Sequence, residues 1–121
     1  MEPGVLNTLV PYDQTTSKGD LLRYQSIVGS GQHLAAQTRP DLSFTLGALA
    51  RFSHNPGPIH IRASNRFLQY LKHTQYLGIS YEAVQNHGNL QAYSDSDYAG
   101  DAETRKSTTG YLFKLANGPI T

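Results

Sequence analysis

The chain has 121 residues, of which 38% are hydrophobic, and its formal net charge is +1 at pH 7. It contains no cysteine, which excludes a disulfide framework and thiolate metal sites. No apolar run reaches about 18 residues, and no basic segment followed by an apolar one opens the chain, so we expect neither a membrane helix nor a signal peptide. We expect an intracellular protein of the cytoplasm or nucleus with a thin hydrophobic core.

The first predicted helix follows an extended lead-in, residues 1–19, which has proline and glycine but no hydrophobic periodicity. Ser17 and Asp20 have the spacing of an N-terminal cap with an acidic partner. Apolar or small residues then recur at intervals of three and four, which predicts one buried helical face: Leu21, Tyr24, Val28, Gly31 and Ala35.

Two more helices are predicted before residue 75. The second begins near Thr38 and Pro40 and ends at Asn55–Pro58, because proline cannot continue a helix. Its predicted buried face is Leu42, Leu46, Leu49 and Phe52. The third covers about 58–74, with a predicted inner stripe of Ile61, Ser64, Phe67, Leu68 and Leu71 and an outer stripe of Arg62, Arg66, Gln69 and His73.

Strands are predicted in the last third of the chain. Leu77–Tyr81 is a short strand candidate, and alternation from Leu90 to Asp95 predicts a strand that ends in a carboxylate. A second alternating run places Tyr111, Phe113 and Leu115 on one face, so the two runs form an antiparallel hairpin, and Asn117–Pro119 forms another turn.

The tip of this hairpin is acidic. Asp95 and Asp97, with Asp101 close behind, could hold a divalent cation through oxygen ligands. A calcium loop of the EF-hand type is rejected, because Ala99 and Lys106 occupy positions where that loop needs oxygen ligands. The five histidines lack metal-ligand spacing and are predicted to be scattered surface residues: His33, His54, His60, His73 and His87.

Several motifs in order resemble the polyproteins of copia-type retrotransposons, where the reverse transcriptase ends and ribonuclease H begins. The hairpin motifs are Tyr93-Ser-Asp-Ser-Asp-Tyr-Ala-Gly-Asp101 and Arg105-Lys-Ser-Thr-Thr-Gly-Tyr111. Upstream stand Tyr24-Gln-Ser-Ile-Val-Gly-Ser30, Thr38-Arg-Pro-Asp-Leu-Ser-Phe44, Ala50-Arg-Phe-Ser-His-Asn-Pro56 and Arg66-Phe-Leu-Gln-Tyr-Leu-Lys72. The resemblance extends from about Leu21 to the last residue.

The resemblance implies that Asp95 corresponds to the first-strand aspartate of ribonuclease H, which binds two catalytic Mg²⁺ ions. The other carboxylates of that site, and the paired aspartates of the polymerase, are expected beyond the two ends of this sequence. We therefore expect Asp95 to be a vestigial catalytic residue, Asp95 and Asp97 to bind Mg²⁺ weakly or not at all, and the chain to be inactive. Gly29 matches a small packing residue of the family, whereas Gly31 departs from the pattern and is expected to weaken the core face.

Two alternatives remain open. The helical part could be a weak binding module for an RNA–DNA or DNA duplex, with Arg62, Arg66, Lys72 and His73 as its phosphate contacts. Short copia-like chains also occur among secreted effectors of plant-pathogenic oomycetes, and the chain resembles them in its retroelement motifs. It lacks the Arg-x-Leu-Arg motif of such effectors, since Leu21-Leu-Arg23 does not match it.

The predicted fold class is α+β: a three-helix unit at 20–75, resembling the thumb and connection of reverse transcriptase, and truncated ribonuclease H-like strands at 76–121. The charge is divided in the same way. Residues 20–74 hold six Lys or Arg and two Asp or Glu, whereas residues 82–103 hold five Asp or Glu and no Lys or Arg. An incomplete sheet has an open edge, which could pair with the rest of a polyprotein or with a second copy.

Overall fold

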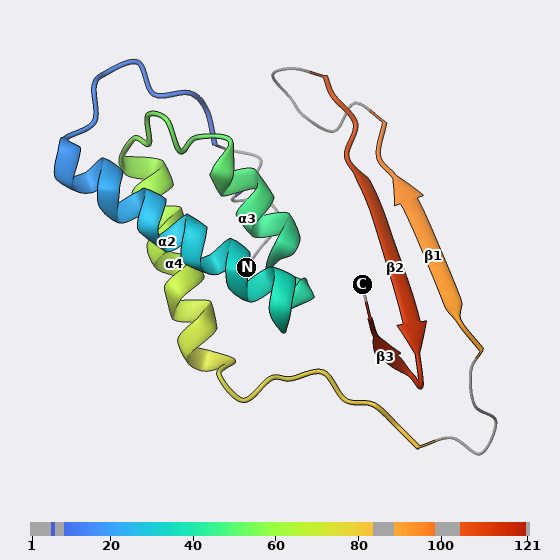
Figure 1. Cartoon of the computed structure of the whole chain (residues 1–121). Helices are drawn as coiled ribbons and strands as arrows, with labels where there is room; N and C mark the ends of the chain where they lie inside the picture. Colours follow the sequence, from blue (N-terminus) through green and yellow to red (C-terminus); the bar gives the residue numbers. More distant parts are fainter. Residues whose placement is uncertain (1–5, 7–8, 84–88, 99–104, 121) are drawn as a thin grey trace. The chain divides into compact units, whose positions relative to one another are not determined.

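The structure is a computed structural model that describes residues 6, 9–83, 89–98 and 105–120. The chain divides into two compact units, Met1–Gly78 and Ile79–Thr121. The helices are α2 (Lys18–Gln37), the short 3-10 helix η1 (Pro40–Leu42), α3 (Ser43–Ala50) and α4 (Pro58–His73), and the strands are β1 (Gln91–Ser96), β2 (Thr109–Leu115) and β3 (Gly118–Pro119) (Figure 1). The predicted α+β fold, three helices followed by a small antiparallel sheet, is confirmed.

Helix α2 begins where its capping residues predict. Ser17 has extended backbone angles, and its hydroxyl accepts a hydrogen bond from the Asp20 amide at 3.2 Å. The same hydroxyl donates to the Asp20 carboxylate at 2.8 Å, which holds the acidic group at the positive end of the helix. A cap of this kind stabilises a helix by about 1 kcal/mol.

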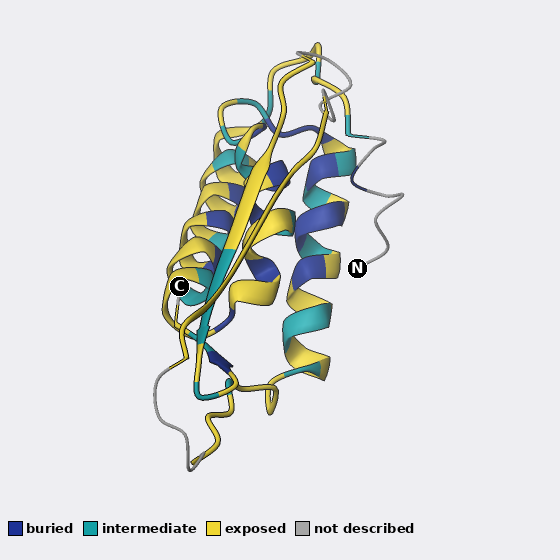
Figure 2. Cartoon of the chain, turned by 90° about the vertical axis from the view of Figure 1, so that its right-hand side faces the viewer, coloured by how far each residue is buried: buried dark blue, intermediate teal, exposed yellow. Residues whose placement is uncertain are grey.

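The core of the helical unit is one cluster of buried side chains from α2, η1, α3 and α4. Its members are Tyr24, Val28, Leu42, Leu46, Leu49, Ala63 and Phe67. The Tyr24 hydroxyl donates to the Leu49 carbonyl at 2.8 Å, so the largest polar group in the cluster is satisfied, and burial raises the pKa of Tyr24. Leu42, Leu46, Leu49 and Phe52 are all buried, as predicted. Figure 2 shows the buried residues concentrated in the helices.

Gly29 and Gly31 of α2 have roles opposite to those expected. Gly29 is exposed, and a methyl group at its Cβ position would meet nothing within 4 Å. At Gly31 the same atom would lie 2.6 Å from Leu46 Cδ2 and 2.9 Å from Phe67 Cζ. The expectation that Gly31 weakens the core face was therefore wrong: the missing side chain lets α3 and α4 approach α2 at this point.

The segment between α3 and α4 holds the lead-in against the helices. Helix α3 ends at Ala50 and turns continue to Asn55, so the helix ends earlier than predicted. The Asn55 amide donates to the carbonyls of Tyr12 and Gln14, and its oxygen accepts from the backbone and hydroxyl of Thr16. Asn55 therefore satisfies backbone groups of a segment that has no helix or strand of its own.

The inner face of α4 differs in two positions from the prediction. Leu68 is 40% exposed, although it was expected in the inner stripe. His60 is fully buried, although it was expected on the surface. Its Nδ1 accepts from the Gly57 amide at 2.9 Å and so caps α4, and its ring lies 4.3 Å from that of Phe52. This bond is the half of a capping box in which a first-turn side chain accepts from the N-cap amide.

The sheet has the order β1-β2-β3, and both pairings are antiparallel. The register runs from Gln91↔Lys114 to Ser96↔Thr109, and this places Tyr111 and Phe113 on one face as predicted. Ala116 and Asn117, with φ of 49° and 61°, form the turn into β3.

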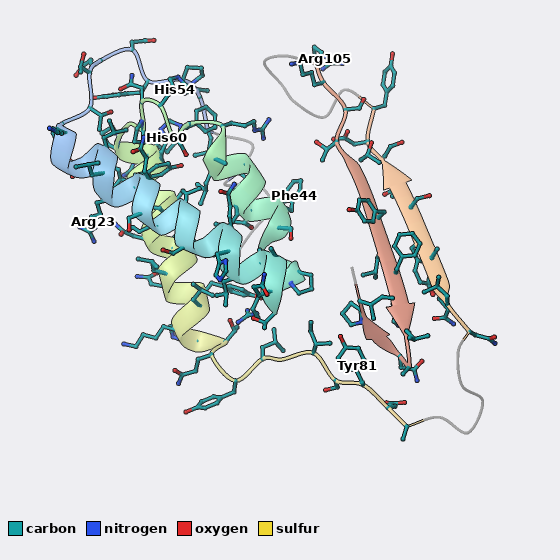
Figure 3. All side chains as sticks on the ribbon, viewed as in Figure 1. Arg23, Phe44, His54, His60, Tyr81 and Arg105 are labelled. Atoms are coloured by element: carbon teal, nitrogen blue, oxygen red, sulfur yellow. The ribbon has the colours of Figure 1, made fainter. Side chains whose placement is uncertain are left out.

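The segment before β1 is not the predicted strand. Leu77–Tyr81 has no strand structure. Instead, the Glu82 amide donates to the Ala116 carbonyl, and the Tyr81 hydroxyl donates to the Pro119 carbonyl at 2.7 Å. The Tyr81 ring covers Gly118, where any Cβ would lie 2.4 Å from Tyr81 Cδ1. Figure 3 labels Tyr81 on the segment that follows α4. The Glu82 bonds and the contacts of the Tyr81 side chain, rather than a regular backbone ladder, hold the segment in place.

Candidate functional site

Helix α4 carries the four predicted phosphate contacts on its solvent side. Arg62, Arg66, Lys72 and His73 are all exposed, as is Gln69 between them. The helix contains no acidic residue, and its last turn holds Lys72 and His73, which favour the negative helix end. The salt bridge found among the described residues joins Arg39 to Asp41, and neither residue belongs to α4. The positive charges of α4 therefore face solvent without a carboxylate partner on their own helix.

Asp95 lies near the end of β1, where the sequence predicts it. The residue opposite it on β2 is Gly110, so no side chain lies directly across the ladder from Asp95. Its Oδ1 accepts a hydrogen bond from the Ser96 amide at 2.9 Å. The Asp95 carboxylate is thus exposed to solvent, and one of its oxygens already accepts a hydrogen bond from the adjacent backbone.

Asp97 follows the end of β1 and is turned toward the other strand. Its carboxylate accepts a hydrogen bond from the Thr108 amide, and its own amide donates to the Thr108 carbonyl at 3.1 Å. Asp97 therefore closes the hairpin ladder beyond the last strand pair. The described residues contain no group of three or more metal-ligating side chains, and Asp101 lies outside the described part of the chain.

A network around Arg39 joins the start of η1 to the end of α4. Arg39 is 6% exposed and makes two bonds of 2.9 Å to Asp41. It also donates to the Thr74 carbonyl and hydroxyl, and its guanidinium lies 5.8 Å from the centre of the Tyr70 ring. The Arg39 bonds lower the pKa of Asp41, and the Asp41 bonds raise the pKa of Arg39. Sequence analysis did not identify this network.

A pocket of about 210 Å³ adjoins the network. Its lining residues are Asp41, Leu42, Phe44, Thr45, Phe67 and Tyr70. Phe44 is 64% exposed and points away from α3 in Figure 3. The Asp41 carboxylate already binds Arg39 and the Tyr70 hydroxyl, so the ionisable groups of the pocket are engaged with one another. The network is best explained as a structural clamp between the two helical ends.

The predicted residues fall into two groups. The structure brings Arg62, Arg66, Lys72 and His73 onto one helix of the first unit, whereas Asp95 and Asp97 belong to the second. No helix of the described residues is long and apolar enough to cross a membrane.

Comparisons with known proteins find clear relatives. The chain is 44% identical to the secreted RxLR effector protein 161 of Plasmopara viticola, over 80% of this chain and 68% of the effector. It is 43% identical to the retrovirus-related Pol polyprotein from transposon RE1 of Arabidopsis thaliana, over 87% of this chain and 7% of the polyprotein. It is 38% identical to the corresponding polyprotein from transposon TNT 1-94 of Nicotiana tabacum, over 85% of this chain and 8% of that protein. No family model and no solved structure matches.

Proposed function

Because this chain belongs to a family of homologous sequences that includes copia-type transposon Pol polyproteins and the secreted RxLR effector protein 161, we propose that it is a retrotransposon-derived segment in which the end of a reverse transcriptase precedes the first strands of ribonuclease H. The order of its parts supports this assignment. A helical unit with a cationic α4 precedes a hairpin whose first strand ends at an aspartate.

The same segment is proposed to be catalytically inactive by itself. The observation that supports this is the environment of Asp95, an exposed carboxylate on β1 that faces Gly110 and binds the Ser96 amide. Two-metal hydrolysis needs several carboxylates around the ions, to activate water and to stabilise the leaving oxygen. Asp97, the nearest described carboxylate in the sequence, accepts from the Thr108 amide. Asp95 and Asp97 together would bind Mg²⁺ weakly at most.

A nuclease assay tests the proposal. The purified 121-residue chain and its Asp95→Asn variant are incubated with a labelled RNA–DNA hybrid and Mg²⁺, and the RNA strand is followed on a gel. We expect intact RNA with both proteins. Cleavage by the wild-type chain that disappears in Asp95→Asn would contradict inactivity and would restore Asp95 as a working catalytic residue.

A second candidate function is weak binding of an RNA–DNA or DNA duplex by α4. Four exposed cationic or titratable side chains on a helix without acidic residues support it. Arginine and lysine bind phosphates chiefly by charge, so such binding would weaken steeply as salt rises. The face could also be an ordinary solvated helix surface, and the two descriptions differ in their salt dependence.

Fluorescence anisotropy with a labelled RNA–DNA hybrid at two salt concentrations distinguishes duplex binding from an ordinary solvated helix surface. We expect a double variant, Arg62→Gln with Arg66→Gln, to lose affinity several-fold at low salt and to show a smaller salt slope. Arg105→Gln removes one exposed charge from the other unit and serves as the matched control. Binding that is absent, independent of salt, or equal in all three proteins would remove this candidate.

The similarity to the RxLR effector favours a third candidate, a role as a secreted effector. Here the comparison covers about two thirds of the relative, against less than a tenth of each polyprotein. Detection of a tagged full-length chain in culture medium, with a cytosolic marker as the control for lysis, would support this candidate. Retention of both proteins inside the cell would oppose it.

A further inference from the structure

Within the described residues, strand β1 has one free edge. In the sheet order β1-β2-β3 its hydrogen-bonded neighbour is β2, and all six of its residues are exposed. The strand contains no proline or lysine, which are the residues that commonly protect an edge from further pairing. We propose that this edge is the interface for a second copy of the same chain, which pairs with it through its own β1 in antiparallel orientation.

The alternation of backbone groups defines which residues would make the contact. The Asp97 amide donates to the Thr108 carbonyl, so residues of the same parity, such as Tyr93 and Asp95, direct their backbone groups toward β2. The remaining residues, Ala92, Ser94 and Ser96, direct theirs toward the free edge. The bond from the Ile120 amide to the Phe113 carbonyl gives the same phase, because Phe113 is opposite Ala92.

These groups favour one symmetric register. Two antiparallel copies related by a two-fold axis pair about a single residue, and outward-facing residues of one copy must meet outward-facing residues of the other. Centring on Ser94 uses all three outward residues: Ser94 pairs with Ser94 of the second copy, and Ala92 pairs with Ser96. Their side chains are small, so they offer no steric obstacle on their face of the extended sheet.

The charge of Asp95 favours antiparallel over parallel pairing of the two β1 strands, and it also makes the pairing weak. In this register Asp95 is opposite Tyr93 of the second copy, whereas an in-register parallel pair would place two Asp95 side chains directly together. Asp95 nevertheless opposes association in two ways. It brings one negative charge per copy to the interface, and its carboxylate occupies the outward amide of Ser96. Asp95 thus reduces, without preventing, the pairing of a second strand with this edge.

Sedimentation velocity of the full chain over a range of concentrations tests the interface. We expect a reversible dimer that strengthens with added salt, since salt screens the two Asp95 charges. Asp95→Asn should strengthen the dimer several-fold and remove most of the salt dependence. Ser94→Pro should abolish the dimer, because it removes an amide that points away from β2 and leaves the β1–β2 ladder bonds in place. Ser94→Ala is the matched control and should behave as wild type.

A crosslink provides a second measurement that does not depend on the proline variant folding. The chain has no native cysteine, so Ser94→Cys introduces a single thiol. Facing Cα atoms of a hydrogen-bonded pair lie about 5.5 Å apart, within the range of about 4.4–6.8 Å that a disulfide spans. In Ala92→Cys the two thiols would be offset by four residues, about 13 Å along the strand. We expect a disulfide dimer from Ser94→Cys and little from Ala92→Cys.

Three results would overturn the proposal. They are a wild-type chain that stays monomeric at every concentration, a Ser94→Pro variant that is folded by circular dichroism and dimerises like wild type, and equal crosslinking of the two cysteine variants. A monomeric chain would leave the β1 edge to a strand of another protein, whereas the other two results would place the contact between copies elsewhere.

Discussion

The helical unit and the sheet unit are held together by different interactions. The helices bury a contiguous cluster around Tyr24, Leu49 and Phe67, each at most 1% exposed. In the described part of the sheet unit the buried residue is Gly118, under the Tyr81 ring, and β1 is exposed along its whole length. A backbone ladder alone contributes little net stability, because its hydrogen bonds replace bonds to water. The difference indicates that the helices contain most of the chain's folding free energy.

The largest expected effect comes from removing one aromatic ring from each unit. Phe67→Ala deletes a side chain at the centre of the cluster and should reduce the free energy of unfolding by about 3–5 kcal/mol. Tyr111 is 66% exposed and contacts Phe113 with a ring distance of 6.0 Å, so Tyr111→Ala should cost about 1 kcal/mol or less. Urea denaturation followed by circular dichroism measures both changes. Equal losses of unfolding free energy would contradict the claim that the helical unit is the more stable one.

A smaller effect is expected from two glycines in one helix. Gly31→Ala places a methyl group against Leu46 and Phe67 and should destabilise the chain by about 1–3 kcal/mol. Gly29→Ala meets open space and should stabilise it by about 0.5–1 kcal/mol through helix propensity. The same denaturation experiment applies, and stabilisation by both changes would show that α2 does not pack closely at Gly31.

The smallest expected effect is a pH dependence from His60. Burial lowers the pKa of His60 in the folded chain from its usual 6.5, and the groups that face it are the backbones of Gly57 and Val10 and the Phe52 ring. Below about pH 6.5 the unfolded chain binds a proton more readily than the folded chain, so the free energy of unfolding should fall as the pH falls. Above that pH the contribution of neutral His60 is fully present.

Denaturation midpoints at neutral and mildly acidic pH test this sign. His60→Gln should lower stability at neutral pH and flatten the acid-side dependence. His54→Gln, at an exposed histidine, is the control and should leave the dependence unchanged. An acid-side slope that persists in His60→Gln would assign the titration to other groups.

The sequence predicted the features that depend on local chemistry. Ser17, Pro40 and the prolines after Asn55 determine helix ends through backbone hydrogen bonding, and those predictions were confirmed or differ by a few residues. Alternation identified the hairpin and placed Asp95 on its first strand, because side chains of a strand point to opposite faces in turn.

The errors occurred where a specific contact, which hydrophobic periodicity does not describe, decides the outcome. Gly31 is needed because Leu46 and Phe67 approach it, and His60 is buried because Gly57 offers an amide to its ring. Tyr81 packs on Gly118 instead of forming a strand. Of the candidate site, the exposure of the α4 cations followed from helical periodicity. The Arg39 clamp and the outward groups of β1 required the fold and its register.

Residue-resolved amide hydrogen exchange tests the difference between the two units most directly. At a concentration low enough to keep the chain monomeric, the amides of α2 and α4 that line the cluster should exchange slowly and with similar free energies of opening. Those of β1 and β2 should exchange markedly faster. Strong and equal protection across 58–73 and 91–115 would contradict the account, because it would mean that the exposed sheet is as stable as the packed helices.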